Sequence, residues 1–113
     1  MEKIVKAIAN VVSTRGSRIL SRNNIFCALL DDLVPEQVEE RQFIKMIYSD
    51  EIGRILYHIS ETPSGDNEKL YEELDKHLQS KSRLIEPARR KFIQVFRDAF
   101  KHRTVKVPKF KDF

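Results

Sequence analysis

The chain has 113 residues, of which 41% are hydrophobic and 34% are charged, and its formal net charge is +4 at pH 7. This length fits one domain, and the apolar content together with charges of both signs excludes a chain that is disordered throughout. No run of about 18 apolar residues occurs, so we expect no membrane span. Lys3, Lys6 and Asn10 interrupt any signal-peptide core, which favours a cytoplasmic protein.

Apolar residues recur at helical spacing from the start of the chain. An isoleucine and valine stripe predicts a first helix over residues 2–13, which Gly16 would end after Arg15 in the last turn. Residues 17–22 are expected to form a connector or a short helical turn. A second helix is expected over residues 23–33.

Proline and polar residues mark the next helix boundaries. Pro35 suits the first turn of a third helix, and Ser49 or Asp50 suits the cap of a fourth helix. Proline, glycine, serine and aspartate gather in residues 60–67, which is typical of a loop.

The second half of the chain contains two more helical patterns. Asp66 or Asn67 is expected to cap the fifth helix, and Glu86 with Pro87 opens a sixth helix with a strongly apolar face. The sequence therefore predicts an all-α fold of five or six short helices in a bundle-like or orthogonal arrangement. We expect one helical domain over residues 1–103.

Residues 104–113 alternate apolar and charged side chains, but Pro108 weakens a strand assignment. We interpret the segment as an extended basic tail or linker. Its apolar residues, if exposed, would dock on the domain itself or on a partner.

Charge is distributed unevenly along the sequence. Residues 1–22 carry five bases and one acid, residues 23–80 carry five bases and thirteen acids, and residues 81–113 carry eleven bases and three acids. Either the basic ends fold against the acidic middle and the fields cancel, or the molecule presents two opposed charged surfaces. Opposed surfaces would favour head-to-tail association or an acidic partner.

Asp31 and Asp32 follow the apolar run of the second helix. Neighbouring side chains on a helix point about 100° apart, and no cluster with metal-ligand spacing accompanies them. Acids at a helix C-terminus also oppose the macrodipole. We interpret the pair as a helix end in which one aspartate pairs with Arg18 or Arg22, with a binding surface or a catalytic site as alternatives.

No motif for catalysis is evident. The single cysteine, Cys27, lies in an apolar run and is expected to be reduced and buried. His58, His77 and His102 fall on separate predicted segments, and no phosphate-binding or H-E-x-x-H motif occurs. We therefore expect no enzymatic activity, no metal, no other cofactor and no small-molecule substrate.

Basic residues near the C-terminus allow a second hypothesis. Arg89, Arg90 and Lys91 start the sixth helix, and the tail interleaves lysines with Phe110 and Phe113, which can stack on bases. No helix-turn-helix accompanies them. The alternative function is thus a small nucleic-acid-binding domain that uses residues 86–103 and the basic tail.

Residues 15–56 resemble a small helical module appended to bacterial multidomain proteins. In that module a Gly-x-x-Ile-Leu turn precedes a Leu-Leu-x-Asp-Leu-x-Pro helix end, and an acidic-start helix and a glycine-bearing helix follow. The residues that carry the resemblance are Gly16, Leu29, Leu30, Asp32, Leu33, Pro35, Glu40 and Gly53. The resemblance implies an adaptor or regulatory role in a bacterial protein. The helix number and charge pattern are also similar to those of the death-fold superfamily of interaction domains.

The sequence thus predicts a non-enzymatic helical domain that binds a protein partner, or a second copy of itself, through opposed charged faces. The candidate interaction residues are Arg18, Arg22, Asp31, Asp32, Glu36, Glu39, Arg89, Arg90 and Lys91.

Overall fold

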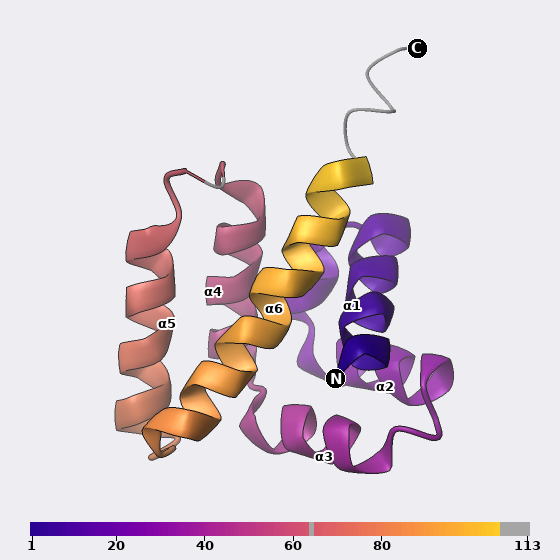
Figure 1. The fold of residues 1–113 in the computed structure, drawn as a ribbon, viewed down its shortest axis with the longest axis horizontal. Coiled ribbons are helices and arrows are strands. Elements are labelled where there is room, and N and C mark those ends of the chain that lie inside the picture. The colour runs from indigo at the N-terminus through magenta and orange to yellow at the C-terminus, as the bar shows by residue number, and fades with distance from the viewer. Residues whose placement is uncertain (64, 107–113) are drawn as a thin grey trace.

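The computed structural model describes residues 1–63 and 65–106, with side chains to residue 102 (Figure 1). Over these residues the chain forms six α-helices and one short 3-10 helix, and no strand. The elements are α1 (Glu2–Arg15), η1 (Ser17–Ser21), α2 (Asn23–Leu33), α3 (Val38–Ile47), α4 (Asp50–Glu61), α5 (Glu68–Lys81) and α6 (Glu86–Lys106). The predicted all-α fold class is confirmed. None of the helices in the described residues is long and apolar enough to cross a membrane.

The last helix, α6, is the centre of the packing. It crosses the front of the molecule diagonally, with α4 and α5 on one side and α1 on the other (Figure 1). Its residues Phe92, Phe96 and Ala99 are fully buried, and their spacing of four and three residues places them on one face of the helix. The ring of Phe96 lies 6.2 Å from the ring of Phe26 and 6.1 Å from that of Tyr48, so α6 contacts the helices of the first half of the chain.

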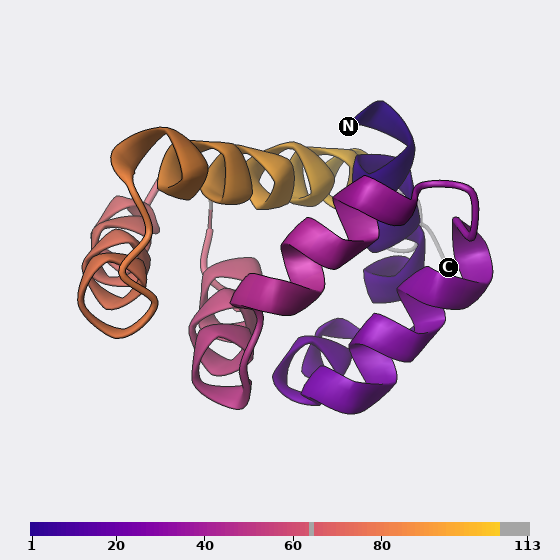
Figure 2. The same cartoon turned by 90° about the horizontal axis from the view of Figure 1, so that it is seen from below.

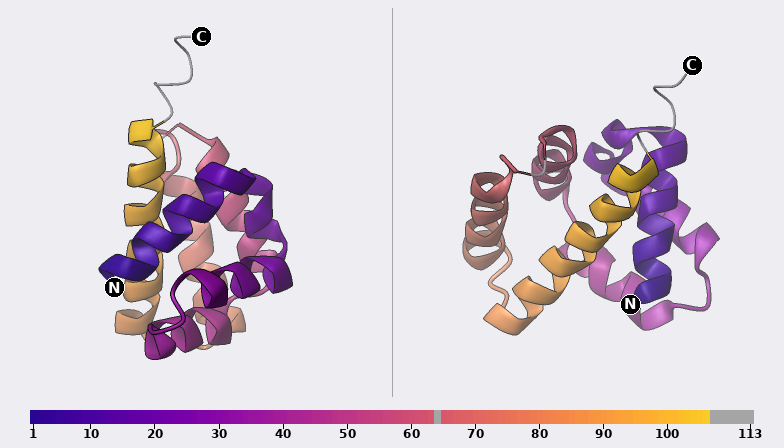
Figure 3. Two further views of the ribbon diagram at one scale, coloured as in Figure 1. Left: turned by 90° about the vertical axis from the view of Figure 1, so that its right-hand side faces the viewer. Right: turned by 45° about the horizontal axis from the view of Figure 1, so that its top comes forward.

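The N-terminal helix also packs on α6. Figure 3 shows α1 crossing α6 obliquely, and the two helices are in contact. The predicted apolar stripe of α1 is buried, with Ile4 and Ile8 both at 0% exposure. The arrangement therefore joins helices from opposite ends of the described chain.

Two further helices, α2 and α3, form a corner at the lower side of the molecule. Figure 2 shows them side by side and running in opposite directions, joined at one end by the loop of residues 34–37. Phe43 of α3 faces Phe92 of α6, with 6.5 Å between ring centroids. The corner is thereby anchored on α6, while Pro35 and Glu36 of the connecting loop are exposed.

A glycine allows α4 to lie directly on η1. A Cβ atom at Gly53 would be 2.0 Å from the carbonyl oxygen of Leu20, so only glycine fits this approach. The hydroxyl of Tyr48 donates a hydrogen bond of 2.5 Å to the same carbonyl oxygen. Ser49 caps α4 by accepting a 3.2 Å hydrogen bond from the N–H of Ile52, which confirms the predicted cap.

Two predicted boundaries differ from the structure. The third helix begins at Val38 and not at Pro35, because the N–H of Gln37 bonds to the carbonyl of Val34 at 3.0 Å and closes a turn before the helix. The sixth helix continues to Lys106, beyond the expected end of the helical domain. The rest of the predicted tail, 107–113, lies outside the described residues.

Candidate functional site

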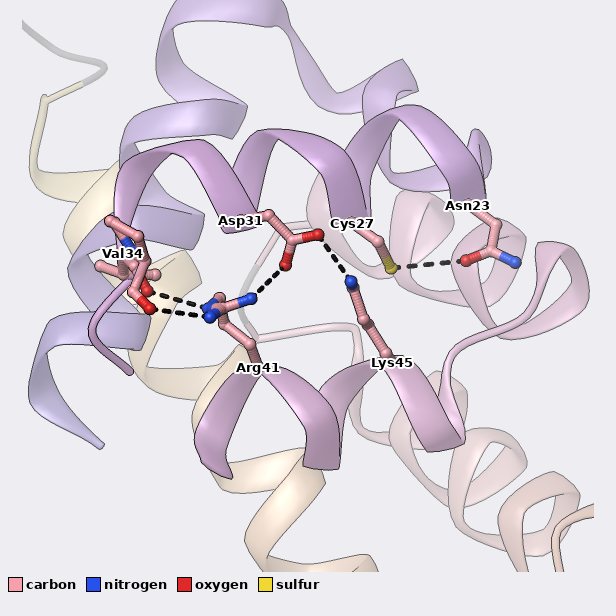
Figure 4. Close-up of polar contacts among 7 residues, drawn as sticks. Asn23, Cys27, Asp31, Val34, Arg41 and Lys45 are labelled. Atoms are coloured by element: carbon pink, nitrogen blue, oxygen red, sulfur yellow. Dashed lines mark hydrogen bonds and ion pairs between the residues drawn. The ribbon is translucent and has the colours of Figure 1, made fainter. Parts of the chain in front are cut away.

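The two aspartates in the last turn of α2, Asp31 and Asp32, have different surroundings. An oxygen of Asp31 lies 2.7 Å from Nη1 of Arg41, and its other oxygen lies 2.6 Å from Nζ of Lys45 (Figure 4). The hydrogen bond from Lys45, followed by that from Arg41, holds the pKa of Asp31 below its usual value. Asp32 is exposed to solvent.

The predicted pairing of an aspartate with Arg18 or Arg22 is wrong. Both partners of Asp31 come from α3, which lies alongside the C-terminal half of α2 (Figure 4). Arg41 also donates hydrogen bonds to the carbonyls of Val34 and Pro35, at 3.0 and 2.7 Å. A cation thus sits at the negative end of α2 and offsets the unfavourable position of Asp31.

Cys27 is buried on the inner side of α2, as predicted. Burial raises the pKa of its thiol, and the thiol donates a 3.5 Å hydrogen bond to Oδ1 of Asn23 (Figure 4). A neutral thiol in this setting acts as a small apolar side chain and not as a nucleophile.

We define the acidic corner as a set of exposed acidic and large apolar residues at the loop that joins α2 to α3 and at the helix ends beside it. Its exposed carboxylates take part in no ion pair within the described chain, and two large apolar side chains lie among them. The acidic corner consists of Asp32, Leu33, Glu36, Val38 and Glu39. Leu33 is 46% exposed and Val38 is 53% exposed. Lys3 and Lys6 of α1 bound the surface beside Leu33.

We define the arginine surface as the exposed cations around η1 together with the apolar residue beside them. It consists of Arg15, Arg18, Arg22, Ile25 and Arg54. These arginines belong to the end of α1, to η1, to the start of α2, and to α4 next to Gly53. None of them forms an ion pair within residues 1–63 and 65–102.

The arginine surface has one apolar centre and one acidic neighbour. Ile25 is 44% exposed. Asp50 accepts a 3.3 Å hydrogen bond from the N–H of Asn23 and shares a shallow hollow with Arg22. Four arginines against one aspartate leave this surface positive.

The predicted basic cluster on α6 is divided among separate contacts. Arg89 binds Asp75 at 2.9 Å, and Arg90 binds Glu86 on its own helix at 2.7 Å. Lys91 lies over the ring of Phe43, 4.9 Å from its centroid. Consecutive helical residues point about 100° apart, so the three cations face different neighbours.

A trough of about 600 Å³ between α5 and α6 contains a two-pronged ion pair. Arg97 binds both oxygens of Glu68, at 2.9 and 3.1 Å, and lies 3.9 Å from the ring centroid of Tyr71. The bond from Arg97 holds the pKa of Glu68 below its usual value, and burial raises the pKa of Tyr71 to about 12. Paired groups of this kind stabilise the contact between two helices.

A wider groove of about 690 Å³ lies between the start of α1 and α6. Its floor is apolar, with Met1, Val5 and Val95, and its rim is charged, including Asp98 and Lys101. No sequence pattern predicts this groove, because it depends on how α1 crosses α6.

Titratable groups do not gather into a metal-binding set. Among the side chains that the structure describes, no three His, Cys, Asp or Glu residues are placed to hold one ion. Nε2 of His77 lies 3.6 Å from a carboxylate oxygen of Glu51, which joins α5 to α4.

No protein-family model, no curated protein and no solved structure matches this chain. The resemblance of residues 15–56 to an appended bacterial module therefore stays a prediction.

Proposed function

We propose that this chain is a non-enzymatic protein–protein interaction domain with an adaptor or regulatory role in the bacterial cytoplasm. It binds its partner through the acidic corner and the arginine surface. These surfaces contain five of the candidate residues from the sequence, namely Arg18, Arg22, Asp32, Glu36 and Glu39.

This proposal rests on one observation, which is the location of the charged side chains that form no ion pair. The ion pairs Asp31–Arg41, Asp75–Arg89 and Glu68–Arg97 lie between helices. In contrast, the exposed charges of the acidic corner and of the arginine surface form no ion pair within the described residues. Exposed charges around a partly exposed apolar residue are typical of a surface that docks a protein.

The nucleic-acid alternative has less support. Three of the cations that it would use, Arg89, Arg90 and Arg97, are already bound to carboxylates. Binding a phosphate there would require breaking an existing pair. The lysines of residues 107–113 lie outside the described residues.

A photo-crosslinking experiment tests the proposal. A photoreactive amino acid replaces Val38 in the acidic corner, Ile25 in the arginine surface or, as a control, exposed Gln79 on α5. Each full-length variant is irradiated in the cells that produce it, and the adducts are sized before and after protease or nuclease treatment. We expect protein adducts from the first two positions and none above background from the third.

Each outcome decides between the two functions. Adducts to any protein, including a second copy, support the interaction domain, especially if Asp32→Lys removes the adduct at Val38. Nuclease-sensitive adducts at Ile25 would favour nucleic acid. Equal labelling at all three positions would overturn the proposed use of these surfaces.

A further inference from the structure

The two ends of α2 carry charges of the sign that disfavours a helix. Arg22 stands at its positive N-terminus, and Asp31 and Asp32 stand in its last turn at the negative C-terminus. Charges placed this way are unfavourable, whereas the reverse order is stabilising. Arg41 offsets Asp31, and Asp50 accepts a hydrogen bond from the N–H of Asn23 at the N-terminus of α2, but neither Arg22 nor Asp32 forms an ion pair within the described residues. Local helix stability therefore does not account for their placement.

The two surfaces are complementary in more than charge. Each includes large apolar side chains that are partly exposed, Ile25 in the arginine surface and Leu33 with Val38 in the acidic corner. Interfaces of this kind exclude water over an apolar centre and place charged groups at the rim. Each surface thus offers the charge opposite to that of the other, together with an apolar side chain for the other to cover.

A single molecule cannot bring these surfaces together. The eleven residues of α2 form a rod of about 16 Å between them, and Phe26 and Leu30 hold that rod in the core. Satisfying both surfaces requires a partner that carries their complements. A second copy of this chain carries both.

We propose that copies of this chain associate head to tail, with the arginine surface of one copy docked on the acidic corner of the next. This inference rests on the proposed interaction function and names its partner. The contact is heterologous, since different surfaces meet, so a bound pair still has one free surface of each kind. Assembly therefore continues as an open chain or closes into a ring.

The small size of the two surfaces indicates a weak affinity between copies. Each surface comprises five side chains, which is far fewer than the 20–30 residues per partner of a standard interface of about 1,600 Å². A contact this small belongs to the weak class. The charged contribution is screened by salt, so association should weaken about tenfold or more between low and high ionic strength.

Two variants that each lack one surface test the inference with full-length purified protein. The corner variant is Asp32→Asn, Glu36→Gln, Glu39→Gln. The arginine variant is Arg18→Gln, Arg22→Gln, Arg54→Gln. Control variants neutralise exposed charges of α5, as Glu72→Gln, Glu73→Gln and as Lys69→Gln, Lys76→Gln. Circular dichroism confirms that every variant is folded.

Multi-angle light scattering over a wide concentration range, at low and high salt, gives the result. The wild type and both controls should grow in mass with concentration and return to 13.3 kDa in high salt. Each surface variant alone should stay a monomer. The equimolar mixture of the corner and arginine variants should stop at a dimer, because the mixed pair has one intact contact and no further free surface that can extend it.

Two other results would contradict head-to-tail association. A mixture that stays monomeric while the wild type assembles would show that other surfaces mediate association. A wild type that is monomeric under every condition would overturn the second copy as partner. Crosslinks from Val38 and Ile25 to other proteins would still support the proposed interaction function in that case. The failure of self-association can therefore be distinguished from the failure of the interaction function.

Discussion

Replacing Gly53 with alanine tests how closely α4 approaches η1. The added Cβ would lie 2.0 Å from the carbonyl oxygen of Leu20 and 3.2 Å from the Cα of Ser21. Both are backbone atoms, so no side-chain rotation can relieve the overlap. Reaching an ordinary contact of about 3.3 Å requires α4 to move away by about 1.3 Å.

The cost of that movement exceeds the gain in helix propensity. Alanine is favoured over glycine within a helix by about 1 kcal/mol. Overpacking costs about 1–3 kcal/mol, and displacing Tyr48 from the carbonyl of Leu20 leaves a buried hydroxyl unsatisfied, at about 1–3 kcal/mol. We therefore expect Gly53→Ala to lower the free energy of unfolding by about 2–4 kcal/mol.

Urea unfolding followed by circular dichroism measures this change. With a slope of about 2 kcal/mol per molar urea, the midpoint should fall by about 1–2 M. The matched control is Gly65→Ala, because a Cβ at Gly65 meets nothing within 4 Å, and its effect should stay within about 0.5 kcal/mol. A Gly53→Ala protein as stable as the wild type, with an unchanged slope, would refute the close approach of α4 to η1.

Three further changes probe the polar contacts of the core and corner. Tyr48→Phe removes the hydroxyl that donates to the carbonyl of Leu20 and should lower the free energy of unfolding by about 1–2 kcal/mol in the same urea assay. Ser17→Ala removes a buried oxygen with no hydrogen-bond partner in the described part of the chain, so it should be neutral or stabilising by about 1 kcal/mol, and a clear loss would reveal an unseen partner. Because the pKa of Asp31 is lower in the folded state than its ordinary value of 3.8, its contribution is fully present above that value and is lost as the pH falls through the folded pKa. Thermal unfolding of Asp31→Asn should therefore depend less on pH in this acidic range than that of the wild type, and parallel curves would contradict the assignment.

Local patterns predicted the helices well because helix periodicity and caps are properties of neighbouring residues. Ser49 is a case in point, since its side chain and the N–H of Ile52 are only three positions apart. The helix start predicted from Pro35 was wrong for a related reason. Its fixed backbone angle suits the first helical turn but equally suits the turn that precedes α3.

The pairing of charges could not be predicted in the same way. Asp31 and Arg41 are ten positions apart on different helices, and their meeting depends on the angle between α2 and α3. The basic cluster Arg89, Arg90 and Lys91 was contiguous in sequence but is dispersed around α6. The exposure of Arg22 and Asp32 at the two ends of α2 follows the predicted charge asymmetry more directly, because it depends on the ends of one helix.

The packing of α1 against α6 has a consequence for the order of events during synthesis. The apolar face that contains Ile4 and Ile8 emerges from the ribosome before α2 to α5, whereas its partner face on α6 emerges after them. Until then α1 lacks its contact with α6, and a short helix without its packing partners is only marginally stable in water. The native core therefore closes after translation has passed residue 100, and the nascent chain must keep this face from aggregating in the meantime.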